Sequence, residues 1–245
     1  MQEVRRMWRY STMVVLTVLT AATFAAILIP FKGVPLVPGY TELRPANVIP
    51  LVFGLLFGPA GAWGAAIGNL IGDFFGTLGI GSFFGFWGNF LAAYLPYKVW
   101  QDRPLDLKAH APRFLLAVLS GAGGCALVIG FGVEAFKLLP FSIIALAVLI
   151  NNAVVVLALA PLLLKLLEPR VRRWDLYWRD LMDPEDCLPG PAPRLGLVLA
   201  LLAIGGGLPT GMALNWGLIS SPGALPAAVL LAPFVLVLLL GCLLM

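Results

Sequence analysis

The sequence predicts an all-α integral membrane protein in which six helices form a bundle and two further transmembrane helices follow it. Apolar residues make up 60% of the chain and charged residues only 11%, and the mean hydropathy is +0.96, values typical of a chain that lies mostly in lipid. Long runs without any charged residue recur along the sequence. Since about 20 apolar residues cross a bilayer, these runs predict the spans.

The charge-free runs place the helices in order. They cover residues 10–31, 45–72, 74–97, 114–133, 138–164 and 195–245. The second run contains the turn signal Gly58–Gly61, which divides it into a short helix from about Asn47 to Phe57 and a helix from about Ala62 to Leu78. The last run is long enough for two crossings, with a turn expected at Ser220–Gly223. The count is therefore eight helices.

Three parts of the chain are expected from this pattern: a six-helix membrane domain over residues 1–170, a cytoplasmic linker over 171–194 and a two-helix membrane extension over 195–245. The linker mixes charges, aromatic residues and prolines. Two interpretations stay open for it. It is either solvated, or its segment Arg172–Leu181 forms a short interfacial helix with aromatic residues on the membrane.

The basic residues predict that both termini are cytoplasmic. With the amino terminus inside, 13 of the 16 Lys and Arg residues fall in cytoplasmic segments, and only Lys32, Arg44 and Lys137 lie outside, as the positive-inside rule expects. The net charge of +4 therefore reflects membrane topology and does not indicate nucleic-acid binding.

The sequence offers few of the residues that catalysis or metal binding would need. Cys125, Cys187 and Cys242 lie in different segments, and His110 is the single histidine, so neither a disulfide framework nor a metal site is indicated. We also find no Ser, His and Asp set that could meet and no phosphate-binding loop. We expect no cofactor, no catalytic residues and no enzymatic activity.

Glycines recur every four residues in the third helix, at Gly64, Gly68, Gly72 and Gly76. Residues four apart share one helix face, so the ladder predicts a smooth face against which another helix packs closely. Asn69 and Asp73 lie one position further along and form a polar seam beside it.

Polar side chains at membrane depth indicate a candidate substrate site, because they are costly there and usually face a partner or a cavity. Candidates within the helices are Asn69, Asp73, Trp87, Asn89, Asn151 and Asn152. The longest predicted extracellular loop, residues 31–45, lies above them, and its region contributes Tyr40, Glu42, Arg44 and Asn47. Structural roles stay open: Asp73 could be a neutral acid beside Asn69 or pair with Arg44, and the paired asparagines could simply link helices.

Several segments resemble the substrate-binding S components of energy-coupling factor (ECF) vitamin transporters. The first helix has the overlapping pairs Ala21 with Ala25 and Ala22 with Ala26. The similarity continues through Glu42–Pro50, Phe53–Pro59, Gly64–Asp73 and the end of the sixth helix at Ala160–Leu167, and it covers roughly residues 10–170. The segment around Arg44, Pro50 and Asn69 is most similar to the branch associated with queuosine precursors.

This resemblance implies a multi-pass protein of a prokaryotic plasma membrane that binds a small, ring-containing vitamin or related micronutrient from outside. A transmembrane coupling subunit and two cytoplasmic ATPases would then drive import by toppling the subunit in the membrane. The resemblance places the docking surface for the coupling subunit on the alanine pairs of the first helix. Residues 195–245 depart from the family, whose core has six helices.

Two other classes of function stay open. A self-sufficient secondary transporter of a small organic solute would need an ionisable relay, for which Asp73 is the only acid in a predicted span; Asp73→Asn would then abolish ion-driven uptake. A membrane assembly factor or enzyme would instead show a stable non-transport partner or a chemical reaction.

Overall fold

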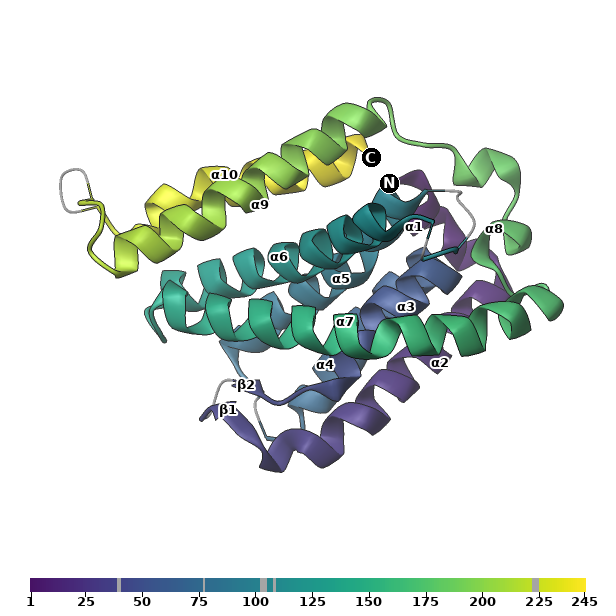
Figure 1. Ribbon diagram of the computed structural model, residues 1–245, viewed down its shortest axis with the longest axis horizontal. Coiled ribbons are helices and arrows are strands. Elements are labelled where there is room, and N and C mark those ends of the chain that lie inside the picture. Colours follow the sequence, from purple (N-terminus) through teal and green to yellow (C-terminus); the bar gives the residue numbers. More distant parts are fainter. Residues whose placement is uncertain (39–40, 77, 102–104, 108, 222–224) are drawn as a thin grey trace.

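The computed structural model describes residues 1–38, 41–76, 78–101, 105–107, 109–221 and 225–245. In this part of the chain, eight helices have ten residues or more, which confirms the predicted count. They are α2 (Ser11–Leu28), α3 (Val48–Phe57), α4 (Pro59–Asp73), α5 (Ile80–Trp100), α6 (Ala111–Ala135), α7 (Phe141–Arg173), α9 (Pro193–Asn215) and α10 (Ala227–Leu244). Figure 1 shows them as one elongated bundle.

Short elements join these helices at the two ends of the bundle. They are α1 (Gln2–Arg6), η1 (Met7–Arg9), η2 (Ile29–Gly33), β1 (Pro35–Val37), β2 (Thr41–Glu42), η3 (Pro45–Asn47), α8 (Trp178–Leu181) and η4 (Pro184–Cys187). Strands β1 and β2 pair antiparallel. We call the end that carries them the hairpin end, and the end that carries α1 and α8 the opposite end (Figure 1).

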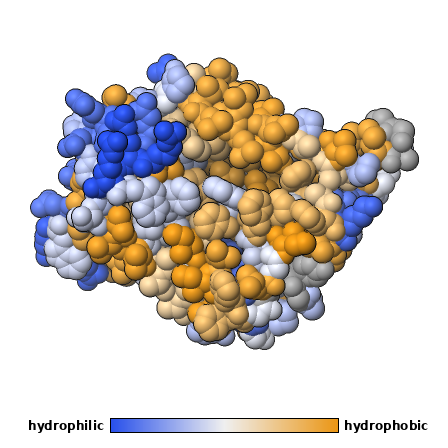
Figure 2. All heavy atoms as spheres, turned by 180° about the vertical axis from the view of Figure 1, so that it is seen from behind, coloured by the Kyte–Doolittle hydropathy of each residue, from blue (hydrophilic) through white to orange (hydrophobic). Residues whose placement is uncertain are grey.

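Among the described residues, five helices are long and apolar enough to cross a membrane: α2, α6, α7, α9 and α10. Helix α7 has 33 residues, which corresponds to about 50 Å and exceeds the hydrocarbon core. Every residue of the ten-residue α3 is buried. This helix therefore packs inside the bundle and does not have to span the membrane. Figure 2 shows hydrophobic residues across the middle of one face and hydrophilic residues gathered toward the opposite end.

A tight turn separates α3 from α4, as the sequence predicted. Gly58 has a φ of +53°, a conformation that favours glycine, and Pro59 occupies the first turn of α4, where its missing N–H costs nothing. Helix α4 ends at Asp73 and not at Leu78, so the prediction for this end was too long.

Three glycines of the ladder bring α4 against α2. A Cβ atom on Gly68 would lie 2.7 Å from the Ala21 carbonyl oxygen, and Cβ atoms on Gly64 and Gly72 would overlap Thr20 and Leu28. Gly76 does not belong to this face. It lies beyond the end of α4 with a φ of +143° and has open space around it, so its predicted packing role was wrong.

The α2–α4 contact divides the predicted docking alanines into two pairs. Ala21 and Ala25 are buried, with exposed fractions of 4% and 5%, whereas Ala22 and Ala26 are exposed. Ala21 and Ala25 are therefore occupied inside the chain, which contradicts their prediction as a docking surface. Only Ala22 and Ala26 are available to another subunit.

The C-terminal pair of helices packs onto the bundle on the side away from α2 (Figure 1). A Cβ atom on Gly207 of α9 would lie 2.9 Å from Leu127 of α6, and the Phe141 ring of α7 lies close to Gly211 of α9. The Asn215 side chain accepts a hydrogen bond of 2.8 Å from the Ser142 backbone N–H. Helices α9 and α10 thus form part of the packed structure.

The linker between α7 and α9 mixes exposed residues with a few buried ones, and it does not form an interfacial helix over Arg172–Leu181. Helix α7 continues to Arg173, and α8 is a single turn. The Trp178 side chain is 4% exposed and lies over Gly58, where a Cβ atom would be 2.5 Å from the indole. Tyr10 donates a hydrogen bond of 2.9 Å to Asp183. We call residues 174–192 the linker strap.

Candidate functional site

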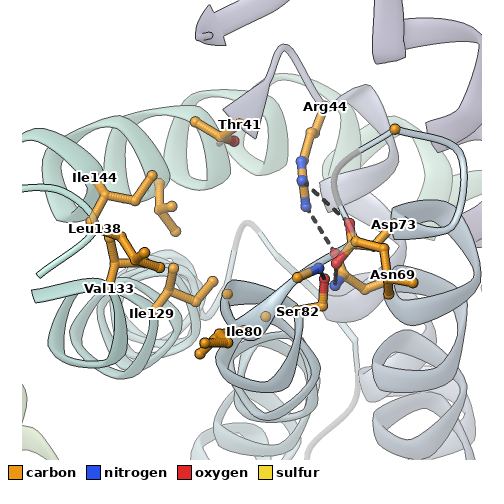
Figure 3. A pocket seen from close by; sticks show the side chains of 16 residues that line it. Thr41, Arg44, Asn69, Asp73, Ile80, Ser82, Ile129, Val133, Leu138 and Ile144 are labelled. Carbon is orange, nitrogen blue, oxygen red and sulfur yellow. Dashed lines mark hydrogen bonds and ion pairs between the residues drawn. The ribbon is translucent and has the colours of Figure 1, made fainter. Parts of the chain in front are cut away.

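A cavity of about 340 Å³ opens at the hairpin end, between the ends of α4 and α6, the starts of α5 and α7, and strand β2. Polar side chains line one part of it and aliphatic side chains another (Figure 3). Its lining residues are Thr41, Arg44, Asn69, Asp73, Gly76, Leu78, Gly79, Ile80, Gly81, Ser82, Gly85, Ile129, Val133, Leu138, Ile144 and Val148.

Arg44, Asn69 and Asp73 form the polar wall and point toward one another (Figure 3). The Arg44 guanidinium donates a hydrogen bond of 2.8 Å to Asn69 Oδ1 and forms an ion pair of 3.8 Å with Asp73. Asn69 Nδ2 donates in turn to Asp73 Oδ2 at 3.1 Å. Asn69 and Asp73 meet because they lie four residues apart on α4, on the same helix face.

Glu42 and Lys32 complete this charged cluster behind the wall. Arg44 Nε donates to Glu42 Oε2 at 2.8 Å, and Lys32 Nζ lies 2.8 Å from Glu42 Oε1 and 3.3 Å from Asp73 Oδ1. Burial raises the pKa of Glu42, but Arg44 and Lys32 lower it more, so the pKa lies below its ordinary value. The cluster holds two cations and two carboxylates and carries no net charge.

Gly85 lets α5 approach the polar wall. A Cβ atom at this position would lie 3.0 Å from Asn69 Nδ2 and 3.7 Å from Asp73 Oδ2, and the first of these separations is tighter than ordinary packing. Facing the polar wall, Ile129, Val133, Leu138 and Ile144 form an aliphatic wall from α6, α7 and the connection between them (Figure 3). A flat ring with a polar edge fits between two such walls, because its faces are apolar.

A second, much smaller pocket of about 20 Å³ adjoins this cavity on its inner side. The two share Thr41, Arg44, Ile129 and Val148 as lining residues. Its other lining residues are Asn47, Asn89, Cys125, Asn151 and Asn152. We call it the amide pocket. A further pocket of about 10 Å³ shares Asn47, Asn89 and Asn152 with it.

Hydrogen bonds hold the amide side chains in place. Asn151 Nδ2 donates to the Glu42 carbonyl oxygen at 3.0 Å, Asn89 Nδ2 donates to the Gly85 carbonyl oxygen at 2.9 Å, and Asn47 Nδ2 donates to Asn152 Oδ1. Asn151 thus ties α7 to the hairpin that carries Glu42. The asparagines serve as links between elements and as pocket lining at once.

The structure divides the predicted site residues among several places. Arg44, Asn69 and Asp73 line the main cavity, Glu42 holds Arg44 from behind, and the four predicted asparagines Asn47, Asn89, Asn151 and Asn152 line the amide pocket. Tyr40 lies outside the described residues.

Trp87 does not belong to the site, so its prediction was wrong. Its side chain is 39% exposed and lies among Trp63, Phe86 and Phe90, with ring centroids 5.2 to 6.3 Å away. An indole is apolar enough to face lipid, and the sequence does not show which way it points.

Sequence reasoning missed Lys32, Thr41, Ser82 and the aliphatic wall. The sequence did contain a signal for Lys32, since it is one of only three basic residues predicted on the extracellular side. Ile129 and Val133 had no such signal in the sequence, because most residues of α6 are apolar and the pattern does not show which of them face a cavity. Among the described residues, no group of three or more His, Cys, Asp or Glu side chains could hold a metal ion.

The helices and the cavity define a multi-pass membrane protein with a solute-sized site at one end. The family model of the QueT transporter matches residues 14–169, which is more than half of the 245 residues. The chain belongs to the QueT transporter family, whose members are S components of ECF transporters. It is thus a multi-pass cell-membrane transport protein. No curated protein and no solved structure matches at a significant level.

Proposed function

We propose that this protein is the substrate-specificity subunit of an ECF importer and binds a queuosine precursor, a substituted 7-deazaguanine, from outside the cell. The family supports the transport role, and the main cavity supports the ligand class. Its volume of about 340 Å³ lies at the small end of the range for ligand pockets. The site therefore suits a single small heterocycle.

The main support for this ligand class is that the cavity has a polar wall with balanced charges on one side and an aliphatic wall on the other. A 7-deazaguanine presents hydrogen-bond donors and acceptors along its ring edge and apolar faces above and below. Arg44, Asn69 and Asp73 can bond to such an edge, while Ile129 and Ile144 pack on the ring. Because the two cations and two carboxylates balance, the site needs no net charge on the ring.

Direct binding tests this assignment. We would titrate 7-cyano-7-deazaguanine into the purified full chain in detergent by calorimetry, without added ions or other subunits. We expect one site with sub-micromolar affinity that does not change when sodium is added. A folded protein that binds no 7-deazaguanine would contradict the proposed substrate class.

Import is proposed to depend on a transmembrane coupling subunit and two cytoplasmic ATPases, with no chemical reaction on this chain. The exposed Ala22 and Ala26 give α2 a small-residue face, and small residues let membrane helices approach closely. This face would let the subunit dock and topple. Because α9 and α10 cover α6, on the side away from α2, they leave this face accessible.

Replacing both alanines tests the docking face. The double variant Ala22→Leu with Ala26→Leu should retain ligand binding but lose co-purification of the coupling subunit and the ATPases from the native host. Gly205→Leu on α9 is the matched control, since nothing lies within 4 Å of a Cβ atom there; it should keep both properties. Equal recovery of partners by both variants would show that docking uses another surface.

A further inference from the structure

The amide pocket contains two buried acceptors that the described residues leave unused. The Oδ1 atoms of Asn47 and Asn151 have no hydrogen-bond partner. Both residues are buried, with exposed fractions of 7% and 6%. A buried acceptor without a partner costs about 1–3 kcal/mol. Two such atoms in one pocket of about 20 Å³ therefore point to a donor that enters from elsewhere.

The orientation of Asn151 is fixed by its neighbour. Its Nδ2 atom donates to the Glu42 backbone carbonyl oxygen at 3.0 Å, and a carbonyl oxygen can only accept. Turning the amide around would place two acceptors against each other. The oxygen of Asn151 is therefore the atom left for another group, and that group must be a donor.

The size and position of the pocket limit this donor further. A space of about 20 Å³ holds about one water-sized group, so an amino group fits and a ring does not. Thr41 and Arg44 line both the amide pocket and the main cavity. A ring lying in the main cavity can therefore direct one substituent past these side chains toward the two amide oxygens.

We propose that the amide pocket is a specificity subsite that accepts the exocyclic amino group of a planar heterocycle, with Asn47 and Asn151 as its acceptors. This inference rests on the proposed function, because it places the ring of a 7-deazaguanine in the main cavity. The subsite would explain how the protein distinguishes one ring from a close analogue. A ring without the amino group leaves both carbonyl oxygens unpaired, and such a site discriminates strongly against it.

Two ligands that differ only in this group provide the test: 7-deazaguanine, which has the amino group, and 7-deazahypoxanthine, which lacks it. We would measure both affinities for the purified full chain by calorimetry. We expect 7-deazaguanine to bind at least about 10- to 100-fold more tightly, the factor for a single unpaired buried acceptor, because the analogue leaves two acceptors unpaired.

Variants of the pocket assign the preference to these residues. Asn47→Leu should reduce the preference to less than about threefold, mainly by weakening 7-deazaguanine. Asn47→Gln keeps both an amide oxygen and an amide donor and should keep the preference. Ser120→Ala removes a buried hydroxyl of α6 that donates to the Ala117 carbonyl oxygen at 3.0 Å and lies outside both the main cavity and the amide pocket, so it should keep the wild-type ratio. Circular dichroism and thermal unfolding would establish that each variant is folded.

The outcomes separate this inference from the proposed function. Tight and equal binding of both ligands to the wild-type protein would overturn the inference and leave the proposed function standing. A preference that survives in Asn47→Leu and in Asn151→Leu would also overturn it. Absence of binding for both ligands would overturn the two together. If Asn47→Leu does not fold, the wild-type ratio and Asn151→Leu still decide.

Discussion

The two ends of the bundle both bury a carboxylate beside a cation, but they use the pair differently. At the hairpin end, Arg44 and Asp73 line a cavity of about 340 Å³ and face an aliphatic wall. At the opposite end, Lys98 Nζ lies 2.6 Å from Glu3 Oε1 and donates at 2.8 Å to the Met245 carbonyl oxygen. The first arrangement presents charged atoms to a cavity, and the second joins the first helix to the last.

The surroundings of Glu3 show why this pair braces the structure. The Tyr97 hydroxyl donates to Glu3 at 3.2 Å, and the Lys98 ammonium lies 5.4 Å from the Tyr94 ring centroid. A cavity of about 290 Å³ lies here too, but the linker strap forms much of its wall, through Trp178, Arg179, Cys187 and Pro189. Similar charge pairs thus line an open cavity at one end and join elements of the bundle at the other.

Arg44→Gln should have the largest effect. Arg44 contacts Glu42, Asn69 and Asp73, so its loss leaves two buried carboxylates with only Lys32 as a cation and disorders the polar wall. Breaking a buried charge pair of this kind costs about 2–5 kcal/mol in binding. We expect affinity for 7-cyano-7-deazaguanine to fall about 1,000-fold by calorimetry. Retained affinity would remove Arg44 from the site.

Lys98→Gln is the matched change at the opposite end and should separate stability from binding. It leaves the Glu3 carboxylate buried without its main cation, which lowers the free energy of unfolding by about 3 kcal/mol. The thermal unfolding midpoint in detergent should fall by several degrees, while affinity for the same ligand changes less than about threefold. A large loss of affinity would show that the two ends are coupled.

The helices could be predicted from the sequence because a segment that crosses lipid must be about 20 residues long and nearly free of charge. The sequence also indicated Asn69 and Asp73, since polar residues are rare at membrane depth, and it indicated Arg44 from the loop expected above them. It could not place α9 and α10 on the side of α6, because connectivity alone does not fix which face a helix covers. The overlapping alanine pairs of α2 show the same limit, as both pairs have identical spacing and only one is buried.

Acid should weaken both ends in the same pH range. Burial raises the pKa of Glu42 and of Glu3, but Arg44 with Lys32, and Lys98, lower each one more, so both folded-state values lie below the ordinary value. A lowered pKa gives stability that is complete above the unfolded-state value of about 4.3 and is lost as the pH falls through the folded-state value. Both contributions should therefore be constant from pH 7 to 5.

Binding measured as a function of pH can distinguish the two carboxyls. As the pH falls through the folded-state pKa of Glu42, which lies below its ordinary value, affinity should fall by at most about tenfold per pH unit for the protonation of one carboxyl. Glu42→Gln should lower affinity at pH 7 and remove this dependence, whereas Glu3→Gln should leave the pH dependence of binding unchanged. If affinity still falls at acid pH in Glu42→Gln, another group is responsible for the pH dependence of binding.

Asn215→Ala should have the smallest effect, and it asks whether the C-terminal helices contribute to the hairpin end. Two side chains from outside α7 cap its first turn: Glu134 accepts from the Phe141 N–H at 2.5 Å, and Asn215 accepts from the Ser142 N–H at 2.8 Å. Loss of one such cap costs about 1 kcal/mol of stability. Ile144, one turn further along α7, lines the main cavity, so a two- to threefold loss of affinity should accompany it.

Asn215→Asp keeps an acceptor at the same place and is the control, since a carboxylate near a helix N-terminus is also favourable. It should retain both the thermal midpoint and the affinity that Asn215→Ala loses. If Asn215→Ala lowers the midpoint but leaves affinity unchanged, α9 stabilises the bundle without shaping the site. If neither changes, the contact between α9 and the start of α7 is incidental, and the six-helix part alone accounts for the hairpin end.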